Sequence, residues 1–236
     1  MKHSFQKRLA GGLGLVLMFC LAAAFPARAQ GKRLRDAERH STAAARVFNQ
    51  IMGVKEKGIP KELLDKAEAI AVFPGVVKAA FIVGGHGGQG VISRRVRGGW
   101  SAPAFFNLGG GSAGLQIGAQ KTDYVLLIMN EDGLKGLLED KFEMGGEVSV
   151  AAGPVGRAAA ATTNATLDAG ILTYSRSKGA FAGVSLKGAV IGHDNDLNQA
   201  VYGVKAKEVL EPGMNIKDAP AETHAFPVTL SRYSRK

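Results

Sequence analysis

Glycine inside apolar, β-branched segments is the feature that most constrains the fold of this chain. From residue 70 onward, segments such as AIAVFPGVVKAAFIVGG, GLQIGAQ and FAGVSLKGAVIG mix strand-forming residues with glycine. Glycine within a strand marks a bulge, sharp curvature or the close approach of another backbone. The chain has 32 glycines in 236 residues, nearly twice the average usage of about 7%. The pattern predicts a curved, largely antiparallel sheet or a barrel-like core.

Helical patterns surround this β-rich region. Apolar residues at intervals of three and four predict a helix over 32–57, and Pro60 begins a second one, PKELLDKAEA. Shorter helices are expected at NEDGLKGLLEDK, capped by Asn130, and at NDLNQAVYGVKAKEVL. The fold class is therefore α+β, with residues 30–69 helical and residues 70–211 mainly β. The apolar stripe of the first helix consists of Leu34, Ala37, Ala44, Phe48 and Ile51.

This first helix is rich in lysine and arginine, and two roles fit it. A basic amphipathic helix can lie on an anionic membrane surface. Its narrow apolar stripe can equally pack on its own domain and leave the charges in water. The sequence is compatible with both roles.

The N-terminus has the pattern of a secretory signal peptide. Basic residues precede an apolar stretch, and Ala27-Arg28-Ala29 follows as a cleavage site. We expect residues 1–29 to be removed and the protein to be exported, either to the periplasm or as a secreted protein. Acylation of Cys20 is the alternative, although Phe19 does not suit such a site. Without Cys20 the chain has no cysteine for disulfides, zinc or catalysis.

The rest of the chain is expected to form one domain followed by a tail. Residues 30–211 show no internal linker, so they predict a single domain. Residues 212–236 are polar and contain Pro220 and Pro227. We expect them to form a loosely held extension.

The segment GGHGGQG at 84–90 contains the spacing G-x-G-x-x-G of dinucleotide-binding folds. Such folds need a helix directly after the glycines and an acidic residue about 20 positions on. Here a β-branched segment follows, and no Asp or Glu occurs between Glu68 and Asp123. The segment is instead predicted to be a glycine-built turn joining two strands.

Two stretches without carboxylates, residues 69–122 and 169–193, carry basic residues. Loss of the four basic residues of the leader lowers the formal net charge from +10 to +6, so the exported chain stays basic. Such segregation produces a positive field that attracts anionic partners, although charges on a strand edge also deter aggregation. In a strand, Arg95 and Arg97 fall on one face and Arg94 on the other. The candidate binding residues are Arg94, Arg95, Arg97, Lys121, Arg157 and Lys178.

Catalytic patterns are poor. His40, His86, His193 and His224 are scattered, and no G-x-S-x-G elbow is present. Asp194 and Asp196 lack the calcium-loop pattern and are expected to cap the following helix. We therefore predict a protein that is not an enzyme and needs no cofactor or metal. A hydrolase using His193 or His86 is the least favoured alternative.

Several segments together resemble the SYLF domain family. They are AIAVFPGVVKAAFIVGGHGGQGVISRR, GGWSAPAFFNLGGGSAGLQIGAQKTDYVLLIMN, GGEVSVAAGPVGR and YSRSKGAFAGVSLKGAVI, followed by Asn198 and Tyr202. The resemblance covers about residues 40–210. It implies binding of phosphoinositides or other anionic phospholipids, with actin binding in fungal members, and no catalysis. The family includes yeast actin-patch proteins and exported bacterial proteins.

These observations predict an exported lipid-binding domain that is peripheral to a membrane and held by anionic head groups. Nucleic acid is not expected as a partner, because no matching motif is present. The alternative is an envelope protein that binds another protein through a sheet edge or a helix face.

Overall fold

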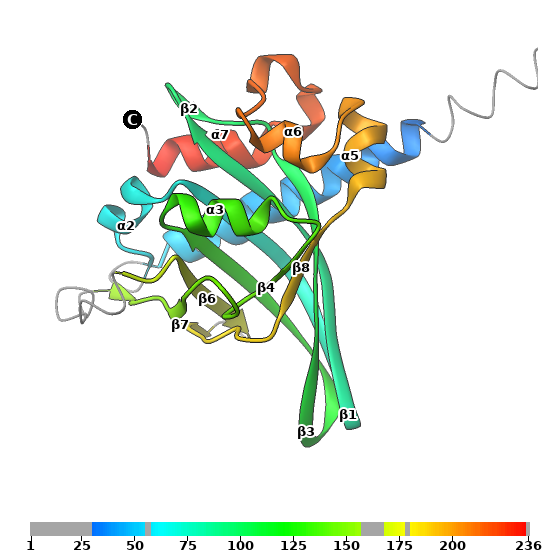
Figure 1. Ribbon diagram of the computed structural model, residues 1–236, viewed down its shortest axis with the longest axis vertical. Helices are drawn as coiled ribbons and strands as arrows, with labels where there is room; N and C mark the ends of the chain where they lie inside the picture. The colour runs from blue at the N-terminus through cyan, green and yellow to red at the C-terminus, as the bar shows by residue number, and fades with distance from the viewer. Residues whose placement is uncertain (1–29, 55–57, 157–167, 178–179, 235–236) are drawn as a thin grey trace, which may run out of the picture.

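The computed structural model describes residues 30–54, 58–156, 168–177 and 180–234, with residues 79–84 and 112–119 described by their backbone. These residues form one curled sheet with helices on both faces (Figure 1). The mixed α+β class and the curved, mostly antiparallel sheet are therefore confirmed. Residues 1–29, expected to be a signal peptide, lie outside the described residues. Among the described helices, none has the length and apolar character needed to cross a bilayer.

Eight strands of the described residues make up the sheet, in the order β2-β1-β3-β6-β5, with β7 beside β6 and β8 between β3 and β4. Neighbours are antiparallel except β5 and β6, which are parallel. The strands are β1 (Ala69–Val96), β2 (Gly99–Trp100), β3 (Ala104–Ile128), β4 (Lys141–Glu143), β5 (Val150–Ala152), β6 (Ile171–Ser177), β7 (Ala180–Gly183) and β8 (Val190–His193).

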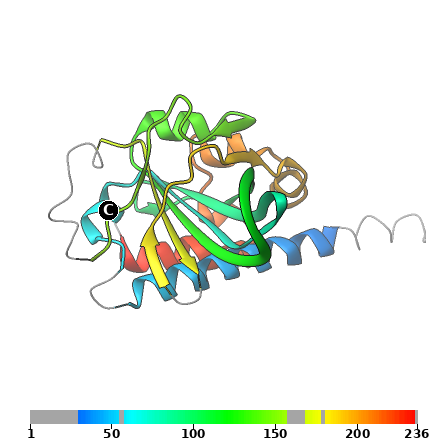
Figure 2. The same cartoon turned by 90° about the horizontal axis from the view of Figure 1, so that it is seen from below.

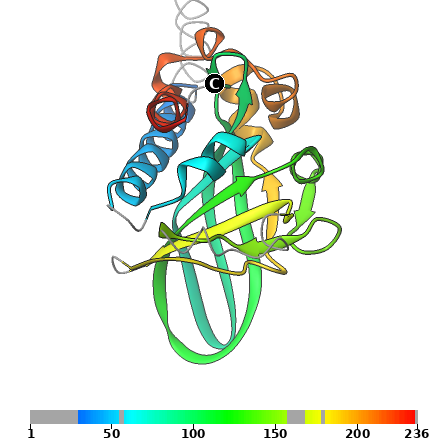
Figure 3. The same cartoon turned by 90° about the vertical axis from the view of Figure 1, so that its left-hand side faces the viewer.

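β1 and β3 are paired along almost their whole length, from Ala69 opposite Ile128 to Ile92 opposite Ala104. The paired strands project from the body and curve back on themselves (Figures 1 and 3). The register shifts between Phe73 and Val76 and between Ala80 and Ile82. Such bulges add local twist and bending. The long pair therefore supplies the curvature of the half-barrel.

The predicted turn at the glycine-rich segment is wrong in its location. Residues 84–90 lie inside β1, and the chain reverses at residues 97–98, where Gly98 has φ +85°. The glycines serve a different purpose, which is close packing between the two arms of the bent strand. A Cβ on Gly90 would collide with the Phe73 ring and with the carbonyl oxygen of Val72. The expectation of sharp curvature and close backbone approach is confirmed.

Alternate residues of the sheet pack into two separate cores, because successive side chains of a strand point to opposite faces. Phe73 belongs to a cluster with Leu134 and Phe142, on the face covered by α3 (Glu131–Leu137) and α6 (Ala206–Leu210). Val72 belongs to the cluster on the opposite face, beneath the N-terminal helix. The α/β packing therefore makes three layers (Figure 3).

The N-terminal helix spans residues 30–52 and lies beside α7 (Ala225–Tyr233) on the same face of the sheet (Figure 2). The Ser41 Oγ donates a hydrogen bond to the Thr223 carbonyl at 2.6 Å and accepts one from the Phe226 amide at 3.1 Å. The rings of Phe48 and Phe226 meet edge to face. Ala37, Ala44, Phe48 and Ile51 of its apolar stripe are buried, and Leu34 is half-buried, so this helix packs on its own domain.

Residues 212–234 are not a loosely held extension. They form the 3₁₀ helices η2 (Ile216–Asp218) and η3 (Ala221–Thr223) and then α7. Phe226 and Leu230 of α7 are fully buried in the cluster beneath the N-terminal helix. Phe226 and Leu230 are four residues apart, so both lie on one face of the helix. This spacing indicates a packed helix, although the segment is polar overall.

Smaller predictions concern the short helices. Asn130 caps α3 by accepting from the Gly133 amide at 2.9 Å, as expected. Asp194 caps α5 (Asn195–Tyr202) by accepting from Leu197. The single helix predicted beyond Asp194 is two helices, α5 and α6, because Gly203 adopts φ +73° and ends the first. The remaining helix, α2 (Lys61–Lys66), follows Pro60 as predicted.

Candidate functional site

A cleft of about 480 Å³ lies between the turn that joins β1 to β2 and the C-terminal segment. One wall is the turn itself, with Trp100 at its end. The other is formed by η2 and the outer face of α7. The lining residues are Val96, Arg97, Gly98, Gly99, Trp100, Asn215, Ile216, Lys217, Pro227, Val228, Ser231 and Arg232.

The charges that line this cleft are all positive. Arg97, Lys217 and Arg232 are exposed, and they come from three different elements. No carboxylate is among the lining residues, all of which the structure describes. Asp218 follows Lys217 in the chain but does not line the cleft. Converging cations without a counter-charge create a local positive potential that favours an anionic ligand.

Arg95, which is predicted to lie on the same face as Arg97, does not line the cleft and makes its contacts with the protein itself. The Arg95 guanidinium donates to the carbonyls of Leu64 at 2.6 Å and Ala67 at 2.8 Å, at the C-terminal end of α2. A helix C-terminus has free carbonyls and a partial negative charge, so it suits a cation. Arg95 also lies over the Trp100 ring, 4.2 Å from its centroid. Its pKa is lowered by burial. Arg95 therefore acts inside the protein.

The C-terminal end of α7 is part of the same arrangement. Ser234 accepts a hydrogen bond from Arg95 at its Oγ, at 2.9 Å, and from the Trp100 indole at its carbonyl, at 3.1 Å. The Ser234 Oγ also contacts the Asp65 carboxylate at 2.7 Å. Ser234 is buried. Arg95 therefore contacts both walls of the cleft, one through Trp100 and the other through Ser234.

The structure separates the other predicted binding residues. Arg94 points to the opposite face of the strand, as predicted, where it approaches the Glu131 carboxylate at 3.5 Å and the Leu210 carbonyl at 3.4 Å. Lys121 on β3 is exposed and is paired with Val77 of β1, toward the projecting part of the sheet. Among the predicted residues that the structure describes, only Arg97 lines the basic cleft. Arg157 and Lys178 lie outside the described residues.

The second stretch without carboxylates, residues 169–193, is contacted by a carboxylate from a neighbouring strand. Arg176 on β6 pairs with Asp123 on the neighbouring β3, with 2.8 Å between Nη2 and Oδ2. Segregation along the sequence therefore does not ensure segregation in space, because adjacent strands come from distant parts of the chain.

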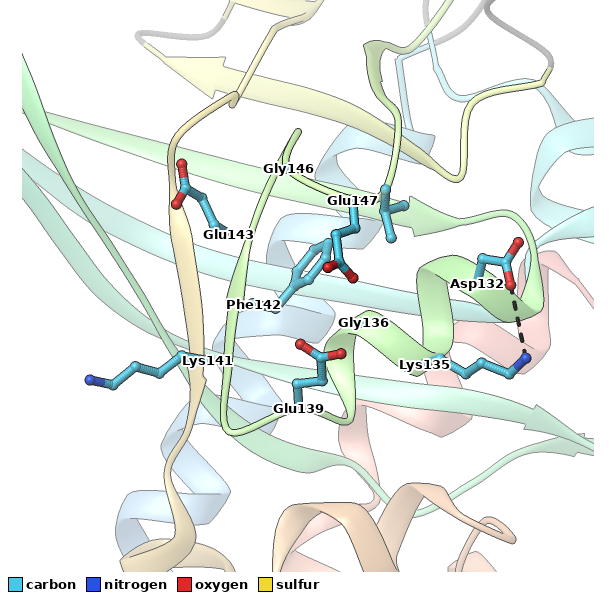
Figure 4. Close-up of a pocket in the computed structure, with 10 residues that line it drawn as sticks. Asp132, Lys135, Gly136, Glu139, Lys141, Phe142, Glu143, Gly146 and Glu147 are labelled. Atoms are coloured by element: carbon cyan, nitrogen blue, oxygen red, sulfur yellow. Dashed lines mark ion pairs between the residues drawn. The ribbon is translucent and has the colours of Figure 1, made fainter.

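A second hollow, between α3 and β4, has the opposite charge (Figure 4). The carboxylates of Glu139 and Glu147 point into it above the Phe142 ring, while Lys141 points away. Asp132 at the rim is paired with Lys135 at 3.9 Å. An anion would be repelled here, so this hollow does not compete with the basic cleft for an anionic ligand.

The histidines do not form a catalytic group within the described residues. His193 is almost buried, with Nε2 3.0 Å from the Leu137 carbonyl and Nδ1 3.8 Å from Asp140. The pocket beside it is lined by Leu138, Asp140, His193, Lys205, Lys207, Glu208 and Glu211, which include no hydroxyl or thiol nucleophile. The His86 ring on β1 lies over Gly110, where a Cβ would come within 3 Å of it. No set of three metal-ligating side chains occurs among the described residues.

Sequence reasoning missed Lys217 and Arg232, since both lie in the segment expected to be a loose tail. The spacing of Phe226, Leu230 and Tyr233 was the available signal for a packed helix. A helix that buries this face must present Arg232 outward. Nothing in the sequence, however, indicated that α7 would lie beside the turn after β1.

Comparison with known proteins places the chain in a family. A family model described as "Ysc84: Las17-binding protein actin regulator" matches residues 109–233, more than half of the chain. LAS seventeen-binding protein 3 of Saccharomyces cerevisiae is 36% identical over 188 residues, which cover 78% of this chain and 40% of that protein. Protein YSC84 of the same yeast is 35% identical over 188 residues, with the same coverage.

A vertebrate relative gives the same result. SH3 domain-containing YSC84-like protein 1 of Xenopus laevis is 32% identical over 180 residues, covering 72% of this chain and 53% of that protein. The protein is thus of the class of Ysc84-like proteins. Specifically, the chain belongs to the Ysc84 family, which confirms the resemblance to SYLF domains. It spans about half or less of the length of these relatives. The description of the family names Las17 binding and actin regulation.

Proposed function

We propose that this protein is a non-catalytic module that binds anionic phospholipid head groups through the cleft lined by Arg97, Lys217 and Arg232. The observation that carries the proposal is the convergence of these three exposed cations without a lining carboxylate. Exposed Val228, at the rim, adds apolar surface suited to contact with the lipid beneath a head group. The basic composition and the family resemblance support the same ligand.

Each basic residue near an anionic membrane contributes about 1 kcal/mol, and salt weakens the attraction. Three such residues give affinity enough for reversible, peripheral association. We further propose that the protein is exported and acts in the periplasm or outside the cell, on the basis of the leader pattern in residues 1–29.

Sedimentation with vesicles tests the proposal. The protein is expected to bind vesicles of equal parts phosphatidylglycerol and phosphatidylcholine at low salt, and not vesicles of phosphatidylcholine alone. Replacing all three cleft cations by glutamine should lower the affinity on the order of 100-fold. The matched control replaces Lys135, Lys141 and Lys207, which are exposed elsewhere, and has the same net charge. It should lose less than about five-fold.

Three results would count against the proposal. They are equal binding to neutral and anionic vesicles, no binding to either, or an equal loss in both triple variants. Inorganic phosphate is included as a soluble competitor. Displacement by phosphate at an ionic strength at which chloride has no effect would show that the cleft recognises the phosphate group itself, whereas equal effects of the two anions would show attraction by charge alone.

A protein partner is the second candidate function, because the relatives are named for binding Las17. The interaction would use a helix face or a sheet edge and would not depend on the cleft cations. Retention of a purified envelope protein at high salt, by wild type and by the cleft triple variant alike, would favour this function over lipid binding.

A further inference from the structure

We infer that Arg95 is a positioning residue for the basic cleft, acting through Trp100 and Ser234 without contacting the ligand. The inference rests on the proposed function and concerns how the site is formed. It changes the role first expected for Arg95, which was direct attraction of head groups. Three observations support it.

The first observation is the orientation of Arg95. It is not among the residues that line the cleft, although Arg97, two positions later, is. Three hydrogen bonds take its guanidinium to Leu64, Ala67 and Ser234. A guanidinium committed to these acceptors and stacked on an indole ring is turned away from a ligand in the cleft.

The second observation is that Arg95 joins the two walls. Trp100 ends the wall formed by the turn, and Arg95 covers one face of its ring. Ser234 follows Arg232 by two positions at the end of α7, which forms the other wall. Because Arg95 holds both Trp100 and Ser234, it sets the position of α7, and hence of Arg232, relative to the turn.

The third observation is chemical. The planar guanidinium donates in a fixed fork and stacks on an aromatic face at the same time, whereas the lysine ammonium is a compact point charge. Lysine at position 95 keeps the positive charge but cannot make this combination of contacts. Arg95→Lys therefore separates the effect of position from the effect of charge.

The sequence contains a single tryptophan, Trp100, so tryptophan fluorescence reports directly on this wall of the cleft. Arg95→Lys is expected to shift the Trp100 emission in the absence of lipid. It should weaken binding to the anionic vesicles about three- to ten-fold, the range that loss of the stacking and hydrogen-bond contributions gives. The steepness of the salt dependence should stay as in wild type, because the number of cations is unchanged.

Arg94→Lys is the matched control, since Arg94 is the preceding residue and lies on the other face of β1, away from the cleft. It should retain the wild-type affinity and the wild-type emission. Arg97→Gln should weaken binding about five-fold and make the salt dependence shallower, because it removes one cation from the cleft.

Ser234→Ala provides a variant with less risk to folding, because it removes only the hydroxyl contacts to Arg95, Asp65 and the Leu64 carbonyl. It should change affinity and emission in the same direction as Arg95→Lys, by a smaller amount. All affinities are measured well below each variant's thermal transition, followed by circular dichroism, so that loss of folded protein does not contribute.

The outcomes separate this inference from the proposed function. No binding of wild type to anionic vesicles would overturn both. Binding by wild type, with Arg95→Lys unchanged in affinity, would overturn the inference alone and would return Arg95 to the role of a simple cation. A lower melting temperature with unchanged emission and affinity would show that Arg95 stabilises the fold without shaping the cleft.

Discussion

Gly90 lies where the two arms of β1 pack closely against each other. Its missing Cβ leaves room for the Phe73 ring and the Val72 carbonyl of the opposite arm. Gly88 makes a similar approach to Val76. Glycine is required at these positions by packing between backbones rather than by an unusual backbone angle, because neither has a positive φ.

Gly90→Ala is therefore expected to destabilise the protein by about 1–3 kcal/mol, the usual effect of overpacking a core. The free energy of unfolding is measured by urea denaturation. Gly111→Ala, on β3, is the matched control, because a Cβ there would have no atom within 4 Å; it should change stability by less than about 0.5 kcal/mol. Similar values for the two variants would contradict the packing described for β1.

Local pattern allowed part of the candidate site to be predicted at the scale of residues. Strand periodicity placed Arg94 and Arg95 on opposite faces, and the structure confirms this, because Arg94 contacts Leu210 and Arg95 contacts Leu64. Arg97 lies beyond the end of β1, in the turn. The partners of Arg95 could not be predicted, because Leu64 and Ser234 are 31 and 139 positions away in the sequence. A basic residue in an acid-free stretch says nothing about the carbonyls and rings that tertiary packing brings to it.

At the scale of elements, α7 is the part of the fold that sequence reasoning described least well. Strands, helix caps and glycine curvature were predictable because each depends on neighbouring residues. The docking of α7 depends on a surface formed by the N-terminal helix and β2, far away in the chain. Residues 212–236 are polar in composition, yet this segment contains α7, one face of which is buried.

Leu230→Ala tests whether α7 belongs to the core. Leu230 is fully buried, so the variant should lose about 2–5 kcal/mol of unfolding free energy. Val228, on the exposed side of the same helix, is 44% exposed, and Val228→Ala should cost less than about 0.5 kcal/mol. If urea denaturation gave the same stability for wild type and Leu230→Ala, α7 would be a detached element.

For the whole molecule, the half-buried histidines His40 and His86 predict how stability depends on pH. Burial lowers the pKa of His40 from its ordinary value of 6.5, and Arg39 lowers it further against the opposing effects of Asp36 and Asp194. Burial and Lys78 lower the pKa of His86. At a given pH, each of these histidines therefore binds a proton more readily in the unfolded chain than in the folded protein.

Stability should therefore be complete above pH 6.5 and decrease as the pH falls from 6.5 toward the lower folded-state values. The urea midpoint is compared at about pH 7.5 and about pH 5.5, a range that lies above the titration of ordinary carboxylates. His40→Gln should reduce the difference between the two midpoints. A midpoint that rises on acidification would mean that these histidines are protonated more readily in the folded protein than in the unfolded one.

The hydrogen bond from Ser41 to Thr223 joins residues 182 positions apart, and it has a consequence for the order of folding. The N-terminal helix is synthesised before the segment around Thr223, which forms part of the surface on which the helix rests. Its final packing must therefore wait until the residues of α7 have been synthesised. Domains closed by contacts of such long sequence separation fold slowly, on timescales of about milliseconds to seconds. Until then, the apolar stripe of the first helix is left without its native cover.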